Sequence, residues 1–480
     1  MSSLHLYDTL SRTTSDFKPL KKGEVGIYLC GATVQAPPHI GHVRSGVNFD
    51  ILRRWLIKSG LEVTFIRNVT DIDDKIIKRA NENSEDISSL TQRFIEAMDE
   101  DSAQLGVLRP DIEPRATAHI DGMIKMITAL IEKGHAYHAD NGDVFFAVNS
   151  FANYGKLSGK SLEDLRAGER VEVDSFKRDP MDFVLWKSAK PGEPCWDSPW
   201  GKGRPGWHIE CSVMGECHLG EHFDIHGGGQ DLQFPHHENE IAQSEAAHDR
   251  TFVNYWMHNG FVQINQEKMS KSLGNFFTIR EIFEKSEWPE AETGEMLRYF
   301  LLATQYRGPL DFSDQALKEA KNAVNGFYDL FARLAETGGN ASGDPGLDPA
   351  IERCTTAFRT AMDDDFNTPM AIAALQGLRS DANKLIADGL SKPARAKARE
   401  AFRSLGGVLG LFRLDHWVFN VEAGGAHPLT SEVEIEKQIA ERTEAKRRKD
   451  FKRADAIRAE LAAQGIVIED KPDGTSRWKR

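Results

Sequence analysis

Two short strings rich in nitrogen-bearing side chains stand out in this chain. The first places His39 and His42 around Gly41, directly after two prolines, and the second places Lys268 and Lys271 in a serine-containing segment. Imidazole and ammonium groups can hold a triphosphate and stabilise the negative charge that spreads over a phosphoryl group under attack. The two strings together predict that the chain binds a nucleotide and catalyses displacement at one of its phosphates.

The sequence around the first string predicts how it would bind phosphate. Residues 41–58 carry apolar side chains at near-helical spacing, so His39, Gly41 and His42 stand at the start of a predicted helix. Free N–H groups and the helix dipole favour phosphate at such a start, and a glycine lets the nucleotide come close. Lys268 and Lys271, on a flexible loop, would close on the triphosphate and act mainly in the transition state.

A glycine-rich segment follows another predicted strand, at 223–226. His226 ends that strand, and Gly228 and Asp231 come directly after it. Nucleotides bind at the carboxyl ends of strands in doubly wound sheets. We therefore expect His226 and Gly228 to contact the nucleotide and Asp231 to bind its ribose hydroxyls, with a simple turn as the alternative.

Cysteine, histidine and glutamate side chains form a candidate metal site, although they are far apart in the sequence. Cys30 ends the first predicted strand, Cys211 follows a loop-rich segment, and His236 and Glu240 are four residues apart, on one face of a predicted helix. All four should converge at the carboxyl edge of the sheet. The sequence has no C-x-x-C pair, so its spacing also allows Cys30 and Cys211 to be ordinary buried cysteines.

The composition excludes several classes of protein. The chain has 480 residues, a net charge of −13 and five scattered cysteines. This length predicts two to four domains, the scattered cysteines argue against a disulfide framework, and no apolar run approaches the ~20 residues of a membrane span. Residues 1–20 lack the pattern of a signal peptide. We therefore expect a soluble, cytoplasmic protein that has no membrane contact.

Strand and helix signals alternate through much of the chain. Apolar segments at 26–34 and 63–66 flank the helix predicted at 41–58, which indicates a βαβ unit. The predicted fold class is α/β: a doubly wound parallel, Rossmann-type sheet with an inserted lobe, followed by an all-α bundle and a small mixed C-terminal module. We predict the two halves of a nucleotide-binding domain at 1–110 and 205–312, the inserted lobe at 111–204, the helical bundle at 313–423 and the module at 424–480.

The two strings resemble the HIGH and KMSKS signatures of class I aminoacyl-tRNA synthetases. Five further motifs narrow the resemblance to the cysteinyl-tRNA synthetase family and extend it along nearly the whole chain: YLCG at 28–31, NVTDIDDK at 68–75, GWHIECS at 206–212, FPHHENE at 234–240 and MDDDFNTP at 362–369. One departure is Gln35-Ala36, where many relatives have Tyr-Asp. The resemblance implies that the chain activates L-cysteine with ATP and Mg²⁺ and transfers it to the 3′-terminal adenosine of tRNA(Cys).

The resemblance also implies a role for zinc. Serine and cysteine differ only by oxygen for sulfur, which pocket shape distinguishes poorly, whereas a borderline-soft metal prefers a thiolate. The family's zinc site corresponds here to Cys30, Cys211, His236 and Glu240. The resemblance assigns substrate contacts to Cys30, Gly31, Thr70 and Trp207 and catalytic contacts to His39, His42, Lys268 and Lys271. For Trp207, packing in the core is an equal alternative.

The C-terminal segment resembles the small anticodon-reading module of the same family. Residues 432–463 are predicted to be helical and residues 465–470 to form a strand. Phe451 stands where the family often has a tryptophan able to stack on a base, and Asp455 and Asp470 match positions whose carboxylates accept base N–H groups. These three residues are the predicted tRNA contacts. A charged helix that promotes solubility is the alternative for this segment.

Three other functions fit parts of the pattern. A ligase similar to the mycothiol ligases would activate cysteine but pass it to a small amino sugar, and the residues after Ser313 favour tRNA instead. A zinc hydrolase using His236, His237 and Glu240 would leave the lysines of the KMSKS string without a purpose. A catalytically silent RNA-binding relative would not need either string intact. We further expect a monomer.

Overall fold

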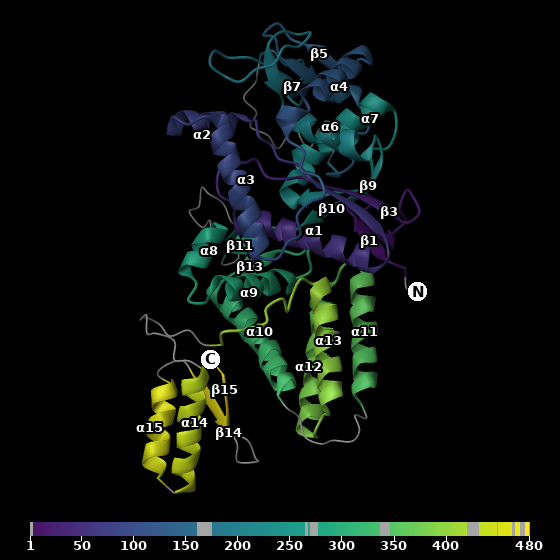
Figure 1. Cartoon of the computed structure of the whole chain (residues 1–480). Helices are drawn as coiled ribbons and strands as arrows, with labels where there is room; N and C mark the ends of the chain where they lie inside the picture. The colour runs from purple at the N-terminus through teal and green to yellow at the C-terminus, as the bar shows by residue number, and fades with distance from the viewer. Residues whose placement is uncertain are drawn as a thin grey trace.

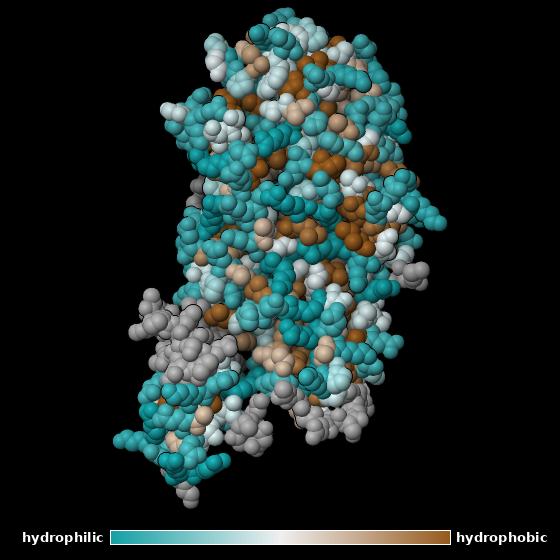
Figure 2. All heavy atoms as spheres, in the orientation of Figure 1, coloured by the Kyte–Doolittle hydropathy of each residue, from teal (hydrophilic) through white to brown (hydrophobic). Residues whose placement is uncertain are grey.

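The chain stacks its parts along one long axis, from the inserted lobe through the sheet and the helical bundle to the C-terminal module (Figure 1). The computed structural model describes residues 3–160, 175–264, 267–268, 277–336, 346–419, 432–448, 450–462, 466–470 and 476–479. Hydrophilic residues cover most of the face shown in Figure 2. Within these ranges, no helix has both the length and the apolar character needed to cross a membrane.

A four-stranded parallel sheet lies at the centre of the molecule and positions the candidate site. Its order is β10 (Val253–Asn259), β9 (Phe223–Gly229), β3 (Glu24–Leu29) and β4 (Glu62–Arg67). Helix α1 (Ile40–Lys58) connects β3 to β4, as predicted, and the chain later returns to the other side of β3. The direction of winding therefore reverses between β3 and β9, where ligands bind in such sheets. The predicted fold class is confirmed.

Side chains alternate between the two faces of the sheet along each strand, and both faces are buried. On one face, Ile27 and Leu29 share a hydrophobic core with α1 and with the helical bundle. On the other face, Tyr28 belongs to a second core, which includes residues of α6 (Trp207–Leu219) and α7 (Glu238–His248). Helices on both faces make this a three-layer arrangement.

The inserted lobe lies between β4 and β9 in the sequence. It contains α4 (Ile120–Glu132) and an antiparallel sheet of β5 (Ala136–His138), β6 (Val144–Phe146), β7 (Phe183–Ser188) and β8 (Gly203–Pro205). Gly142 has a φ of +88° in the hairpin turn between β5 and β6, a conformation that glycine adopts readily. Before the lobe come α2 (Asp74–Asn83) and α3 (Ile87–Gln104), and the chain begins with the hairpin of β1 (His5–Asp8) and β2 (Thr13–Asp16).

After β10 the chain forms a small sheet and then the helical bundle. The sheet has β11 (Val262–Ile264) between β12 (Glu267–Lys268) and β13 (Leu310–Phe312), with α8 (Ile279–Lys285) and α9 (Glu290–Leu302) before β13. The bundle consists of α10 (Asp314–Ala335), α11 (Leu347–Asp363), α12 (Thr368–Ala387) and α13 (Lys392–Val408). One continuous core runs from Ile27 in the central sheet to Phe402 in α13, so the bundle is firmly attached to the sheet.

The C-terminal module has two helices in its predicted helical segment. These are α14 (Glu432–Arg447) and α15 (Phe451–Ala462), and they are followed by the hairpin of β14 (Val467–Asp470) and β15 (Ser476–Lys479). Asp450 accepts a hydrogen bond from the N–H of Arg453 and so caps the second helix. The break lets the apolar residues of α14 and α15 pack together in a small core, which one straight helix would leave exposed.

Candidate active site

A cavity of about 640 Å³ opens where the winding of the sheet reverses. Its lining includes Cys30 after β3, Gly229 at the end of β9, Asn259 at the end of β10, and Gly41 and His42 in the first turn of α1. This volume lies within the ordinary range for small-molecule sites. The cavity therefore stands where both the sheet topology and the sequence motifs place a nucleotide.

The first turn of α1 is organised by its two histidines. His39 is the N-cap, and its Nδ1 accepts a hydrogen bond from the N–H of Gly41 at 3.1 Å. The backbone N–H of His39 donates to Nδ1 of His42 at 3.4 Å, and the two rings stack with centroids 3.6 Å apart. The stacked rings hold the helix start against the cavity, which all three residues line.

The segment that carries the KMSKS string is anchored beside this helix start. Lys268 belongs to β12, which pairs with β11, and Lys271 lies outside the described residues. On the far side of the string, Thr278 forms a β-bridge with His39, and Phe277 accepts a hydrogen bond from the N–H of Ile40 at 3.4 Å. Both described flanks of the string are therefore held within reach of the HIGH string.

The four predicted metal ligands come together from three elements. Sγ of Cys30 lies 3.5 Å from Sγ of Cys211 and 3.6 Å from Oε1 of Glu240. Nε2 of His236 lies 3.1 Å from the same Oε1. Cys30 follows β3, Cys211 lies in α6 and Glu240 in α7, and the ligand atoms of all four residues lie within 4.8 Å of one another.

These distances match the shape that zinc requires. Bond lengths of about 2.3 Å to sulfur and 2.0–2.2 Å to nitrogen or oxygen give tetrahedron edges of roughly 3.8 Å between two sulfurs, 3.5 Å between sulfur and oxygen and 3.4 Å between nitrogen and oxygen. The three corresponding separations are 3.5, 3.6 and 3.1 Å. Burial raises the pKa of both the Cys30 and the Cys211 thiols. A bound cation would oppose this effect, because it favours thiolate over thiol, so the donor set fits zinc.

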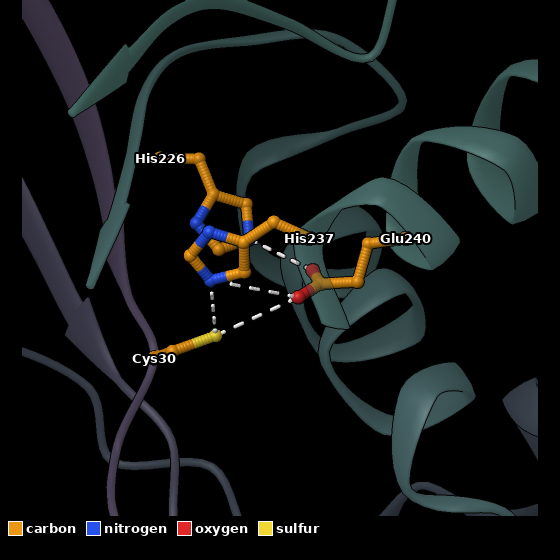
Figure 3. A group of neighbouring side chains, drawn as sticks. All are labelled: Cys30, His226, His237 and Glu240. Atoms are coloured by element: carbon orange, nitrogen blue, oxygen red, sulfur yellow. Dashed lines mark hydrogen bonds and ion pairs between the residues drawn. The ribbon is translucent and has the colours of Figure 1, made fainter. Parts of the chain in front are cut away.

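Two further histidines, His226 and His237, lie next to Cys30 and Glu240, as Figure 3 shows. Nε2 of His226 lies 2.8 Å from Oε2 of Glu240. Nε2 of His237 lies 3.3 Å from Sγ of Cys30, and its Nδ1 lies 2.8 Å from Nε2 of His258. All three rings are buried. Partners of this kind hold metal ligands in a fixed orientation.

An alternative set of four ligands combines His226 and His237 with Cys30 and Glu240. The two sets share Cys30 and Glu240. Cys30 lines the cavity, whereas His226 and His237 do not, and Trp207, which stacks on His236 with centroids 4.0 Å apart, lines it as well. The predicted set therefore has a second ligand, His236, in contact with a cavity-lining side chain, and its second thiol suits zinc better.

The structure brings some of the other predicted residues to the cavity and keeps others away. Gly31, Trp207 and Asp231 line it. Gly228 is not among the lining residues. Thr70 is buried outside the lining and donates a hydrogen bond to Oε2 of Glu210 at 2.9 Å. His226 is outside the lining too, and its fully buried ring lies against Glu240, so its contact with ATP stays a prediction.

The C-terminal module presents its predicted contacts in different ways. Phe451 is 62% exposed, as stacking on a base requires, and Asp455 is exposed too. Asp470 accepts hydrogen bonds from Arg442 at 2.7 and 2.9 Å and from Lys446 at 2.6 Å. The Arg442 bonds hold the pKa of the Asp470 carboxyl well below its usual value. A base would therefore compete with these cations for Asp470.

Sequence reasoning missed Arg44, whose partners Gly260 and Phe261 line the cavity. Its guanidinium is completely buried and donates hydrogen bonds to four backbone carbonyls beyond β10 and before β13. The sequence did contain a signal for this buried arginine. Arg44 lies next to Val43 and one turn before Val47, on the apolar face of the predicted helix, and a charged residue on such a face indicates that its charge has a buried hydrogen-bond partner.

Comparison with known proteins identifies the class to which this fold and cavity belong. Residues 16–322 match the family model described as the tRNA synthetases class I (C) catalytic domain. The solved structure of Mycobacterium tuberculosis methionyl-tRNA synthetase in complex with methionyl-adenylate is similar in fold, with a TM-score of 0.56 at 16% identity over 80% of this chain and 89% of that one. The chain has the fold of the class I aminoacyl-tRNA synthetases.

Closer relatives specify the family. The cysteine–tRNA ligases of Methylobacillus flagellatus and Laribacter hongkongensis are 58% and 55% identical to this chain, each over 99% of it and 100% of the relative. Residues 357–413 match the DALR domain and residues 432–478 the cysteinyl-tRNA ligase anticodon binding domain. The chain belongs to the cysteine–tRNA ligase family and is an ATP-dependent aminoacyl-tRNA ligase, with cysteine, ATP and tRNA as its partners.

Proposed function

We propose that the cavity selects cysteine through a zinc ion, activates it with ATP and retains the adenylate until the 3′-terminal adenosine of tRNA(Cys) accepts the cysteinyl group. One observation carries this proposal: Cys30, which belongs to the cluster of two thiols, an imidazole and a carboxylate, lines the same cavity as the histidines at the start of α1. A cysteine side chain and a triphosphate could therefore occupy one cavity together.

The amino-acid end of the cavity supplies selectivity. Held by Cys30, Cys211, His236 and Glu240, zinc would provide a borderline-soft acceptor that prefers the sulfur of cysteine to the oxygen of serine. Trp207 stacks on His236 and would form the wall over the amino acid. Gly31 and Thr70 are the proposed contacts for the rest of the amino acid. Thr70 could make its contact only after its hydroxyl turned away from Glu210, to which it donates a hydrogen bond.

The nucleotide end supplies positive charge and N–H donors. The first turn of α1, with His39, Gly41 and His42, would bind the phosphates, and Asp231 would accept hydrogen bonds from the ribose. Gly228 would contact ATP through its backbone. Lys268 and Lys271 would close over the triphosphate from the anchored segment and stabilise charge in the transition state.

Two displacements complete the reaction without an enzyme nucleophile. A carboxylate oxygen of cysteine forms a bond to the α-phosphorus of ATP, the bond to the bridging oxygen breaks, and pyrophosphate leaves with Mg²⁺. A ribose hydroxyl of the terminal adenosine then attacks the carbonyl carbon, its proton passes to a phosphate oxygen of the adenylate, and the bond to AMP breaks. The side chains of the cavity need only bind, orient and neutralise charge.

The C-terminal module would recognise the tRNA anticodon. Phe451 is proposed to stack on a base, while Asp455 and Asp470 accept base N–H groups. The match of residues 432–478 to an anticodon binding domain supports tRNA over the small amino sugar of the alternative proposal. A monomeric state stays a prediction.

Pyrophosphate exchange tests the selection of cysteine. We expect cysteine-dependent exchange to far exceed serine-dependent exchange, and a chelator to abolish this preference. Cys211→Ser should lower exchange with cysteine by at least about 100-fold, since loss of one ligand removes the metal, whereas Cys195→Ser, at an exposed cysteine outside the cluster, should not. Undiminished preference for cysteine in the metal-free protein would refute zinc selection.

A further inference from the structure

A second cluster of metal-binding side chains lies at the far end of α6 from Trp207. His119 stands just before α4, and Cys217 and His218 lie in the last turn of α6. Their ligand atoms all lie within 4.8 Å of one another. Nε2 of His119 is 3.2 Å from Nε2 of His218. Two nitrogens bound to one tetrahedral zinc ion would be roughly 3.3 Å apart.

The tautomer of His119 is fixed by the hydrogen bond of its Nδ1 atom. Nδ1 of His119 lies 2.8 Å from the carbonyl oxygen of Arg115. A carbonyl only accepts hydrogen bonds, so Nδ1 carries the proton and Nε2 presents a lone pair towards His218. A backbone carbonyl that fixes the tautomer in this way is the usual partner of a histidine that binds a metal.

Cys217 completes the cluster with a softer ligand. It is exposed and forms no disulfide. One thiolate and two imidazoles favour zinc over magnesium or calcium. A neighbouring group, Glu216, Glu221 and His248, is a poorer candidate, because Arg250 already pairs with Glu221 at 3.0 Å and His248 lies 3.2 Å from Glu216.

We propose that His119, Cys217 and His218 bind a second divalent transition-metal ion, most readily zinc, with water in the fourth position. This site is distinct from the cysteine-selecting one, since Cys211 and Cys217 are six residues apart on α6, a rise of about 9 Å. The ion would join the start of α4 to the end of α6, the helix whose first turn carries Trp207 at the cavity. It is a structural clamp between the inserted lobe and the wall of the amino-acid pocket.

Metal stoichiometry of the full-length protein tests this proposal. The protein is stripped of metal, reloaded with excess Co²⁺ or Zn²⁺ and freed of loose ions. We expect two equivalents for the wild type and for Cys195→Ser, an exposed cysteine outside both clusters. Cys217→Ser and His119→Ala should each retain one equivalent and near wild-type pyrophosphate exchange. Zinc should also slow alkylation of Cys217 by iodoacetamide in the wild type but not in His119→Ala.

The outcomes separate this site from the cysteine-selecting one, on which it does not depend. Two equivalents in Cys217→Ser, or equal alkylation of Cys217 with and without zinc, would overturn the proposal. One equivalent in the wild type that is lost in Cys211→Ser would also overturn it and leave the cysteine-selecting site intact. One equivalent that is lost only in Cys217→Ser would support the clamp and refute the other site instead.

Discussion

Arg44→Met should destabilise the protein strongly, because Arg44 joins α1 to two distant turns. Nη1 donates to the carbonyl oxygens of Gly260 and Phe261 at 2.7 and 2.8 Å, and Nη2 donates to those of Tyr306 and Gly308 at 3.2 and 2.6 Å. Methionine has a similar length and is apolar, so it would fill the space but remove all four of these hydrogen bonds, while the carbonyls of Tyr306 and Phe261 keep their backbone donors, Gly260 and Leu310.

The magnitude follows from two opposing terms. Four charge-assisted hydrogen bonds contribute roughly 1.5–3 kcal/mol each, or about 6–12 kcal/mol together. Burial lowers the pKa of Arg44 from 12.5 to about 10, which corresponds to a cost of roughly 3 kcal/mol for the buried cation. The net loss in Arg44→Met should therefore be at least about 3 kcal/mol.

Urea unfolding of the wild type and of Arg44→Met measures this loss of stability. Lys58→Met, at an exposed residue in the last turn of the same helix, is the matched control and should change stability by less than about 1 kcal/mol. The stability of Arg44→Lys should fall between those of the wild type and Arg44→Met, because one ammonium cannot reach four carbonyls. Pyrophosphate exchange should fall in Arg44→Met as well, since Gly260 and Phe261 line the cavity. A stability within about 1 kcal/mol of the wild type would refute the assigned role of Arg44.

Burial raises the pKa of Asp101 to about 6 despite Arg280, so the folded state binds this proton more tightly than the unfolded state, and stability falls as pH rises from about 4 to about 6. Asp101→Asn should therefore raise the Tm at pH 8, and the gain in Tm should shrink to nothing near pH 4. A gain that stays constant between these pH values would contradict the raised pKa of Asp101. Arg477 pairs with Asp329 of α10 at 2.8 Å, which links the C-terminal module to the bundle. Arg477→Ala should lower kcat/KM for tRNA several-fold and leave pyrophosphate exchange unchanged, unlike the exposed control Arg447→Ala, and equal charging by the two variants would refute this linkage.

Local periodicity predicted the elements of the central sheet because their residues are buried in a regular pattern. Residues 41–58 showed the apolar spacing of α1, and the segments around it became β3 and β4 in the expected parallel pairing. The hairpin β1–β2 went unpredicted, because its second strand, TTSD, is exposed throughout and carries no apolar alternation. The boundary between α14 and α15 was not predicted for a related reason, since charged residues lie on both sides of the Asp450 cap.

The candidate metal group could be anticipated, whereas its surroundings could not. Cys30 follows a predicted strand and Glu240 lies in a predicted helix at the same edge of the sheet, so topology brings these two residues near one another, whereas the helix α6 that carries Cys211 was not predicted. The contacts of His226 and His237 depend on the rotation of α7 against β9, which no periodicity specifies. A histidine that ends a strand predicts a ligand contact and a buried hydrogen bond equally well.

Backbone contacts join the start of α1 to the described residues that follow the KMSKS string. His39 and Thr278 form a β-bridge, and the N–H of Ile279 donates to the carbonyl of Pro38 at 3.2 Å. Such contacts place few demands on residue type, so no motif reports them. Arg44, one turn along α1, fastens the other side by holding the segment that leads into β11. The start of α1 therefore supports the described residues on both sides of the KMSKS string, and we expect this support to place the string beside the phosphates proposed to bind at His39 and His42.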